Sequence, residues 1–383
     1  MKLFHLSDLH IGKRFREYSL VEDQKHVLAQ ILSLVESEAP DVVMIAGDVY
    51  DRAMPSEEAV SVFDDFLFRL SESDARVMII SGNHDSQERL AYGGRIMNKS
   101  GIHISPEFNI ANYENIIKPV MLNDEFGEVN FYLLPFITPA AVRCIKKEQP
   151  ISNTSEAVKA VIDDMSVDGS KRNILIAHQF VTGASVSKSE TSYVGGTDNV
   201  DVSVFEPFDY VALGHIHGPQ HIGRETVRYC GTPLKYSFSE IGQKKSITVV
   251  EVGEKGDIGI SELPLDRTLH DLVEIHGSFD EVIRQSNNKD FVRVVLDNRN
   301  EFNVWNRLHE YFGFLAEINF ADSSCEREFS SAELEKVENM SRTDLFAEYF
   351  AKYNDGRELS ERQREIVEKS FEQAAKEISG GGI

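Results

Sequence analysis

The sequence has few cysteines and no long apolar run, and both absences limit what the protein can be. Its three cysteines, Cys144, Cys230 and Cys325, lie far apart without CxxC spacing. Neither a disulfide framework nor a structural zinc site is therefore expected. Runs of about 18 apolar residues are absent, and the opening MKLFHLSDLH reaches polar residues too early for a signal peptide. We expect a soluble cytoplasmic protein without a membrane partner.

Basic residues are also scarce relative to acidic ones. The chain has 40 Lys and Arg against 63 Asp and Glu, a formal net charge of −23. Affinity for a phosphate backbone normally comes from clustered Lys and Arg, so this balance argues against a nucleic-acid partner. Net charge bears mainly on solubility and steering, however, and bound divalent ions can be the largest local charges in a site. The acidic balance therefore does not exclude DNA.

The pattern of apolar segments predicts an α/β domain over residues 1–268. Buried strands are expected at KLFHL, DVVMIA, ARVMIIS, RNILIA and FDYVALG, which lack polar alternation and so suit strands covered on both faces. Two further strands are expected within FNIANYENIIKPVMLND and GEVNFYLLPF. Helices fit between the strands at residues 24–38, 56–73, 88–100 and 154–164.

Two smaller parts follow the α/β domain. Residues 269–322 predict a small α+β unit in the order strand, helix, strand, helix, strand, and residues 323–383 predict a polar linker (within DSSCEREFSS) and a helical tail. Ser341 with Asp344, and Ser360 with Gln363, have the spacing of capping boxes that open two helices. The apolar stripes of these helices need a covering surface, either their own domain or a partner.

Polar clusters directly follow five of the expected strands. The carboxyl ends of strands in open α/β sheets are where sites assemble, so the clusters can converge on one edge. Any one of them is weak evidence, because a lone H-x-H on a strand is more often packing than ligation. Together they predict a site built from Ser7-Asp8-Leu9-His10, Gly47-Asp48 with Asp51, Gly82-Asn83-His84-Asp85, Ala177-His178 and Gly214-His215-Ile216-His217.

These residue types suit two divalent metal ions, because hard-to-borderline metals bind carboxylate and amide oxygens and neutral imidazoles. The two side chains of a D-x-H or H-x-H pair point the same way on a strand, so both can face one site. One metal is assigned to Asp8, His10, Asp48 and His217. The other is assigned to Asp48, Asn83, His178 and His215, with Asp48 as the bridge.

The expected chemistry is phosphoester hydrolysis. Two ions about 4 Å apart clamp a phosphoryl group and lower the pKa of a bound water, so a metal-held hydroxide is the expected nucleophile. His84 is left without a metal in this assignment, and we expect it to steady or protonate the leaving oxygen, with Asp51 orienting its ring. The plainer alternative is that His84 only makes a supporting hydrogen bond. His5, inside the first strand, is expected to be a core residue.

At SDLH, GDVYDR, GNHD, AHQ and GHIH the chain resembles the calcineurin-like metallophosphoesterases, and these motifs span residues 7–217. The resemblance implies a four-layer fold of two packed sheets flanked by helices. Within that superfamily the chain is most similar to the SbcD group of nuclease subunits, bacterial relatives of the double-strand-break repair nuclease. This finer resemblance rests on FHLSDLHIGKRF, on GDVYDRAMPSEEAV, and on the total length with a small domain and a helical tail.

The resemblance to SbcD implies a DNA substrate. It implies 3′-to-5′ exonuclease activity on duplex ends and endonuclease activity on single strands, usually with manganese (Mn2+), in DNA repair, recombination and replication. Residues 269–322 would form a cap that shapes DNA access, and the tail would bind an SbcC-like coiled-coil ATPase, which could supply the missing positive surface. It also implies a homodimer, with which the two apolar faces of SEEAVSVFDDFLFRLSES are consistent, although a purely internal helix would look similar.

Two other functions fit parts of the sequence. A small-molecule or protein phosphatase, or a cyclic-nucleotide phosphodiesterase, would need the same clusters but not the region beyond residue 268. A scaffold that tethers DNA ends would not need a complete metal site. In this sequence every predicted ligand position is filled by a residue that can bind a metal, which argues against a scaffold. Lys13, Arg14, Arg16 and Arg52 lie close to the clusters in sequence and are either phosphate contacts or solvated surface.

Overall fold

The computed structural model describes residues 1–187, 199–266, 268–298, 303–321, 341–353 and 357–380. It divides into two compact units, Met1–Ala321 and Asp322–Ile383. The predicted linker DSSCEREFSS lies outside the described residues, as does Cys325. The other two cysteines are free thiols, Cys144 exposed and Cys230 buried. No helix within the described ranges is long and apolar enough to cross a bilayer.

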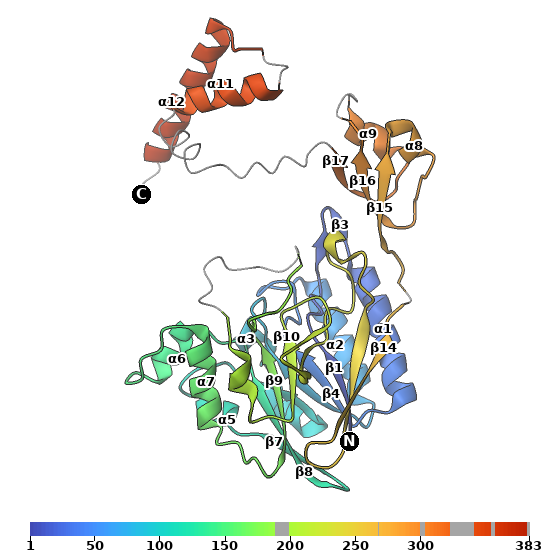
Figure 1. Cartoon of the computed structure of the whole chain (residues 1–383), viewed down its shortest axis with the longest axis vertical. Coiled ribbons are helices and arrows are strands. Elements are labelled where there is room, and N and C mark those ends of the chain that lie inside the picture. Colours follow the sequence, from blue (N-terminus) through green and yellow to red (C-terminus); the bar gives the residue numbers. More distant parts are fainter. Residues whose placement is uncertain (188–198, 267, 299–302, 322–340, 354–356, 381–383) are drawn as a thin grey trace. The chain divides into compact units, whose positions relative to one another are not determined.

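Two six-stranded sheets form the body of the first unit (Figure 1). The first sheet has four parallel strands, β1, β4, β5 and β6, and two antiparallel ones, β13 and β14. Its spatial order is β14 (Ile258–Pro264), β13 (Ser246–Val252), β1 (Lys2–Leu6), β4 (Val42–Ala46), β5 (Arg76–Ile80), β6 (Ile102–Ile104). The second runs β11 (Gln220–Ile222), β12 (Arg224–Tyr229), β10 (Tyr210–Gly214), β9 (Arg172–His178), β8 (Gly127–Leu134), β7 (Val120–Asp124).

The sheets pack face to face, with helices on their outer sides. Fully buried side chains from both sheets, such as Met44 and Ile80 from the first and Ile176 and Ala212 from the second, form one core between them. Helices α1 (Val21–Glu38) and α2 (Glu57–Ser71) cover the first sheet, and α6 (Pro139–Ile145) and α7 (Thr154–Asp164) cover the second. The expected four-layer fold is confirmed.

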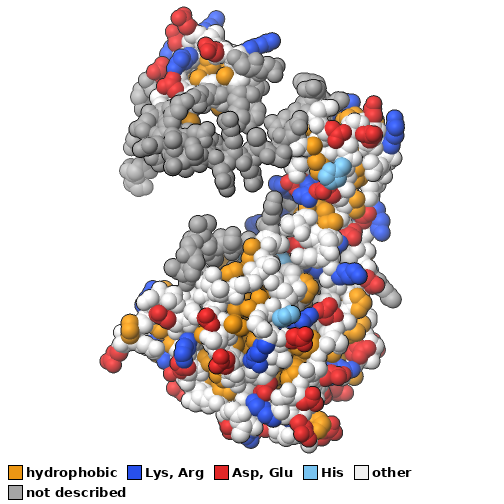
Figure 2. All heavy atoms as spheres, in the orientation of Figure 1, with side chains coloured by type: hydrophobic (Ala, Val, Ile, Leu, Met, Phe, Trp, Pro, Cys, Tyr) orange, Lys and Arg blue, Asp and Glu red, His pale blue; other side chains and the backbone are white. Residues whose placement is uncertain are grey.

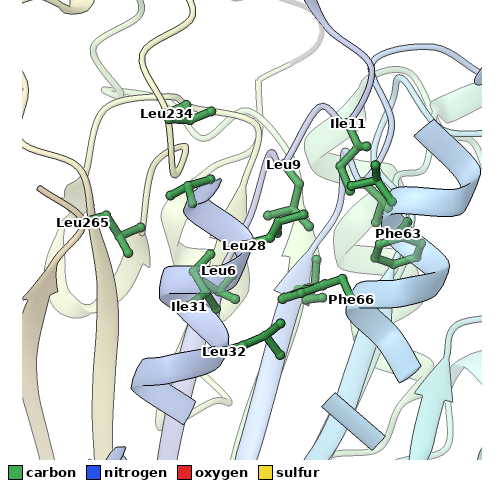
Figure 3. Packing of buried hydrophobic residues seen from close by; sticks show 14 of the residues in the cluster. Leu6, Leu9, Ile11, Leu28, Ile31, Leu32, Phe63, Phe66, Leu234 and Leu265 are labelled. Atoms are coloured by element: carbon green, nitrogen blue, oxygen red, sulfur yellow. The ribbon is translucent and has the colours of Figure 1, made fainter. Parts of the chain in front are cut away.

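The outer face of the first sheet holds the largest core (Figure 3). Leu28 and Ile31 of α1 and Phe63 and Phe66 of α2 point onto the strand that carries Leu6. Leu9 and Ile11 belong to the same cluster, although they lie in the loop that follows β1. The loop that carries Asp8 and His10 is therefore anchored by the buried apolar side chains of Leu9 and Ile11.

Helix α2 uses both of its apolar faces within the chain. It begins after Ser56, whose side chain accepts a hydrogen bond from the Ala59 amide, as an N-cap should. One apolar face carries Val60, Phe63 and Leu67, and the other carries Val62, Phe66 and Leu70. All of these are buried except Val60, which is 45% exposed. Internal packing thus accounts for the buried residues of the pattern, whereas Val60 and Phe68 stay exposed in the chain.

Some predicted elements differ from the observed ones. The helix expected at 88–100 is three short pieces, α3 (Gln87–Leu90), α4 (Gly94–Met97) and η1 (Asn98–Ser100), because Gly93 takes a left-handed φ of 73° and interrupts it. The first added strand begins only at Val120, and a short helix, α5 (Tyr113–Ile116), precedes it. The sequence pattern did not predict strands β11 to β14 or the 3-10 helices η2 (Val202–Phe205) and η3 (Phe238–Glu240).

Residues 272–320 form the small α+β unit in the predicted order. The elements are β15 (Leu272–Gly277), α8 (Phe279–Ile283), β16 (Phe291–Leu296), α9 (Val304–His309) and β17 (Leu315–Phe320), and the strands form a parallel sheet with its own core. A hairpin of β2 (Arg14–Phe15) and β3 (Tyr18–Ser19) contacts this unit. Its Phe15 ring lies 5.6 Å from that of Phe291, and its Tyr18 ring 5.4 Å from that of Phe314.

The described residues of the second unit form two helices, α11 (Arg342–Tyr353) and α12 (Glu361–Gly380). The Ser341 hydroxyl accepts a hydrogen bond from the Asp344 amide at 3.1 Å, and the Ser360 hydroxyl accepts one from the Gln363 amide at 3.4 Å. Ser360 also donates its own amide to the Gln363 side chain at 3.0 Å. Both helices therefore begin where the capping pattern predicts.

His5 is the core residue that the sequence predicts. It is fully buried in β1, and its ring nitrogens lie 3.0 Å from the Tyr210 hydroxyl and 3.2 Å from the Leu213 carbonyl oxygen. Burial lowers the pKa of His5 from 6.5 to about 3. The ring is therefore neutral in the folded protein at neutral pH.

Acidification is expected to destabilise the fold through His5. Because its folded pKa of about 3 lies below the unfolded value of 6.5, the unfolded chain takes up the proton first. The free energy of unfolding should therefore fall between pH 6.5 and 3, by about 1.4 kcal/mol per pH unit from this group. Urea unfolding of the metal-free protein at several pH values should show a shallower pH dependence for His5→Gln than for wild type. A control at the exposed His221, His221→Gln, should match wild type, and an unchanged slope in His5→Gln would contradict the prediction.

Candidate metal centre

The predicted clusters come from the ends of strands in both sheets. Asp8 and His10 follow β1, Asp48 follows β4, and Asn83 with His84 follow β5, all in the first sheet. In the second sheet, His178 ends β9, and His215 and His217 follow β10. Hydrogen bonds join the first two loops, from the Asp8 amide to the Gly47 oxygen (3.0 Å) and from the His10 amide to the Asp48 oxygen (2.9 Å).

The backbone is unusual at four of these positions. Asp8, His10, Asp48 and His215 have φ values of 52°, 45°, 47° and 102°, and they make up half of the non-glycine residues with positive φ in the described chain. L-amino acids rarely adopt this region, and a surrounding structure must hold them there. Its concentration at one place marks these loops as a functional site.

Two glycines allow the loops to approach each other. A Cβ atom on Gly82 would lie 2.1 Å from the Asp48 carboxylate, and one on Gly214 would lie 1.9 Å from the Ala46 carbonyl oxygen. Neither distance is possible between non-bonded atoms, so a larger residue at Gly82 would separate two loops of the first sheet, and one at Gly214 would push the two sheets apart. The glycines of the GNHD and GHIH motifs are therefore needed for the side chains to converge.

All seven predicted ligand side chains meet in one place. Ligand atoms of Asp8, His10 and His217 lie within 4.8 Å of one another, and so do those of Asp8, Asp48 and His178. The Asn83 side-chain oxygen lies 3.0 Å from His178 Nε2 and 2.9 Å from His215 Nδ1.

Asp48 lies between the two sets of side chains. One of its oxygens, Oδ2, is 3.7 Å from His10 Nε2 and 3.5 Å from His178 Nε2. A carboxylate within reach of both sets is what a bridging ligand requires. The assignment of each residue to a particular ion stays a prediction.

The side chains fit divalent cations. His10 Nε2 and His217 Nε2 lie 3.3 Å apart, and both rings are almost completely buried. Two imidazole lone pairs that point at each other repel unless a proton or a cation lies between them. The surrounding carboxylate, amide and imidazole donors are those that hard-to-borderline divalent metals prefer. The protein therefore has a divalent-metal site at this position.

The charges at the site are strongly coupled. Burial raises the pKa of Asp8, and the nearby Asp48 carboxylate adds to this effect. Burial alone would lower the pKa of His178, but Asp48 and Asp8 outweigh it and raise that pKa to about 9. Burial and His178 together lower the pKa of His215 to about 3. A buried pair of carboxylates that holds a proton on the neighbouring His178 is an environment that a bound cation would stabilise in place of that proton.

His84 lies at the edge of the cluster. Its side chain is 31% exposed, and Nε2 is 4.0 Å from Asp48 Oδ2. The backbone carbonyl of Asp51 orients the ring, at 2.9 Å from Nδ1, whereas the Asp51 carboxylate accepts a hydrogen bond from Lys13 at 2.7 Å. Asp51 thus contacts His84 as expected, but through its backbone carbonyl group and not through its side chain. His84 also lies close enough to His10 and Asp48 to join them around a metal.

Several residues that support the site were not singled out from the sequence. Asp85 accepts hydrogen bonds from the Val49, Tyr50 and Gly82 amides, which ties the second loop to the third. Its place in GNHD was the only available signal. Three others lie far from the motifs: Gln24, which donates to the His10 carbonyl oxygen, Tyr236, which donates to the Leu9 carbonyl oxygen, and Glu240, beside His217.

The basic residues near the site already have partners. Lys13 binds Asp51, Arg16 lies 3.6 Å from Glu317, and Arg14 donates to the Glu17 carbonyl oxygen. Arg52 is 78% exposed and lies 3.7 Å from Asp51. On the face shown in Figure 2, basic and acidic side chains are interspersed. This face offers no broad basic surface of the kind that usually attracts a phosphate backbone.

Comparisons with known proteins agree with this geometry. The family model for calcineurin-like phosphoesterases matches residues 1–219. The chain is 35% identical over 306 residues to the SbcD component of the nuclease SbcCD from Staphylococcus epidermidis, covering 79% of this chain and 77% of the relative. It is also 35% identical to the SbcD component from Staphylococcus saprophyticus, covering 74% of each.

Among solved structures, a calcineurin-like phosphoesterase of Bacillus subtilis, YfkN, is similar with a TM-score of 0.37 and 15% identity. The match covers 69% of this chain and 90% of that one. The metal-dependent phosphoesterase chemistry expected from the clusters is confirmed by the family match. The chain belongs to the calcineurin-like phosphoesterases and, within them, to the SbcD family of nuclease subunits.

Proposed function

We propose that this chain is the nuclease subunit of an SbcCD-type complex and hydrolyses DNA phosphodiesters. The observation that carries the proposal is the extent of the similarity to the staphylococcal SbcD proteins. The aligned 306 residues cannot fit within residues 1–268, the predicted phosphoesterase domain that contains the metal centre. The similarity therefore includes residues that a minimal phosphatase would not need, and the relatives that share them are named as nuclease subunits.

The residues of the centre would take the roles that their positions suggest. Asp8, His10, Asp48 and His217 would hold one ion, and Asp48, Asn83, His178 and His215 would hold the other. When bound, the ions stabilise the charge that develops on the phosphoryl oxygens and activate a water molecule. The chain itself fixes the donors before substrate arrives, because the strained loops are held by backbone hydrogen bonds and buried apolar side chains.

His84 supplies a proton to the leaving oxygen. The Asp51 carbonyl oxygen can only accept a hydrogen bond, so Nδ1 carries the proton that it receives. A second proton on Nε2 can then pass to the leaving group. The partial exposure of the ring, in contrast to the buried imidazoles around it, places His84 where a large substrate could reach it.

The finer details of the proposal come from the family resemblance. The ions are Mn2+, and the activities are 3′-to-5′ exonuclease on duplex ends and endonuclease on single strands, in the cytoplasm, for repair, recombination and replication. Residues 269–322 form a cap, residues 323–383 bind an SbcC-like coiled-coil ATPase, and the protein is a homodimer. The ATPase supplies the positive surface that the acidic chain lacks.

Hydrolysis assays with matched substrates test the proposal. Linear duplex, hairpin and single-stranded DNA should be incubated with Mn2+ or Mg2+, beside a phosphomonoester and a cyclic nucleotide, each with and without the ATPase partner. Shortening of the duplex from its 3′ ends with Mn2+ is the expected result. Hydrolysis of only the phosphomonoester or the cyclic nucleotide would replace the nuclease with a small-molecule phosphoesterase.

A further inference from the structure

A buried ion pair lies behind His217. Glu240 is fully buried, and one of its oxygens is 3.3 Å from His217 Nδ1 while the other is 2.7 Å from Lys245 Nζ. Lys245, 7% exposed, also donates to the His217 carbonyl oxygen at 3.1 Å and to the Thr232 hydroxyl at 2.7 Å. The ring and the main chain of His217 are thus both held by this pair.

His217 differs in this respect from neighbouring imidazoles. The Nδ1 atoms of His178 and His84 face backbone carbonyl oxygens, of Ala46 at 2.8 Å and of Asp51 at 2.9 Å. His10 Nδ1 has no hydrogen-bond partner among the described residues, and the Asp51 carboxylate is 3.7 Å away. At His217, by contrast, the carboxylate of Glu240 lies at hydrogen-bonding distance from Nδ1. A side chain rather than the main chain therefore orients this ring.

Stability alone does not explain a buried pair of charges. Removing both ions from water costs free energy that their attraction often fails to recover, and apolar residues of similar volume are often as stable. A carboxylate that accepts the proton of a metal-binding imidazole has a different effect. It fixes the tautomer and the direction of the ring, and it makes the other nitrogen a stronger electron-pair donor to the metal. Here the other nitrogen, Nε2, points toward His10 Nε2 at 3.3 Å.

We propose that Glu240 is a positioning residue for the metal site of Asp8, His10 and His217. Glu240 accepts the Nδ1 proton of His217, which directs the Nε2 lone pair to the ion, and Lys245 supplies the counter-charge and pins both partners. The proposal rests on the metal-binding role proposed for His217, but not on the identity of the substrate. Neither residue lies in the predicted motifs, so this is a further determinant of metal affinity.

Metal titration separates positioning from structural support. The double variant Glu240→Gln with Lys245→Met removes both charges at nearly constant volume, so no unpaired charge is left buried. Mn2+ binding, followed by calorimetry and by electron paramagnetic resonance without DNA, should show one of two sites weakened about 10- to 100-fold and the other unchanged. The matched control is Asp124→Asn with Arg172→Met, a charge pair between strands β7 and β9. It should keep both affinities, whatever its effect on thermal unfolding.

Two outcomes would overturn the proposal. One is a folded double variant that binds both ions with wild-type affinity. The other comes from the wild-type protein, which keeps the test decisive if the variant does not fold. Nuclear magnetic resonance of 15N-histidine-labelled, Zn2+-loaded protein should show His217 protonated at Nδ1, with the proton shifted far downfield by the carboxylate. Protonation at Nε2 instead would contradict it. Because DNA is absent from both measurements, failure of the nuclease assay would leave this result unaffected.

Discussion

Replacing Asp48 with asparagine is expected to eliminate hydrolysis together with metal binding. Asp48 is nearly fully buried, and its carboxylate lies 3.7 Å from His10 Nε2 and 3.5 Å from His178 Nε2, within reach of both sets of candidate ligands. Asparagine keeps the shape but loses the charge that compensates for two dications. The ions stabilise the transition state by several kcal/mol, so the rate should fall by about a thousandfold or more.

Metal content and activity should be measured on the same Asp48→Asn sample. Bound metal after dialysis against Mn2+ should drop for both sites, whereas the exposed Asp64→Asn on α2 should behave as wild type. The Asp48 side chain also holds the loop of His84, whose backbone amide donates to Asp48 Oδ1 at 2.9 Å. Thermal unfolding must therefore accompany the assay. A folded variant with both ions retained would refute a bridging role for Asp48.

Replacing His84 with glutamine is expected to stop hydrolysis without releasing metal. The ring lies beside the ligands with Nε2 4.0 Å from Asp48 Oδ2, and Asp51 holds it from the main chain. Glutamine can still form hydrogen bonds but cannot give up a proton near neutral pH. General acid catalysis contributes about 10²- to 10⁴-fold, so kcat should fall within that range.

The Mn2+ content of His84→Gln decides between two roles for this residue. Two ions per chain with wild-type affinity, measured by calorimetry, would support a proton donor. Loss of an ion would make His84 a ligand, which the grouping of His10, Asp48 and His84 also allows geometrically. Full activity would leave it only a supporting hydrogen bond. His221→Gln, at an exposed position on β11, controls for nonspecific effects of the substitution.

Strand positions and the convergence of the polar clusters were predictable because each has a strong local signal. The runs KLFHL, DVVMIA and RNILIA are continuous and apolar, and they become β1, β4 and β9 between two covered faces. The polar clusters directly follow them, so the common edge of the sheets brings the clusters together. The capping pairs at Ser341 and Ser360 likewise fix helix starts through contacts only three residues apart.

The supporting residues could not be predicted because their partners lie far away in sequence. Gln24 holds the loop of His10 from a helix, and Glu240 reaches His217 from a 3-10 turn. A single polar residue in an apolar context has no spacing that would reveal such a contact. The prediction of one continuous helix at 88–100 was wrong for a different reason. Its composition suits a helix, but the left-handed conformation at Gly93 is set by the tertiary fold.

The left-handed backbone at Asp8, His10, Asp48 and His215 has a consequence for how the protein exchanges metals. These conformations are held by the chain itself, through hydrogen bonds between loops and buried neighbours such as Leu9. An arriving ion therefore does not have to assemble its own coordination shell, and a departing ion does not leave a loop to refold. Binding of a divalent cation would then cost little loop ordering, so its occupancy would depend on its affinity for these donors and on its availability.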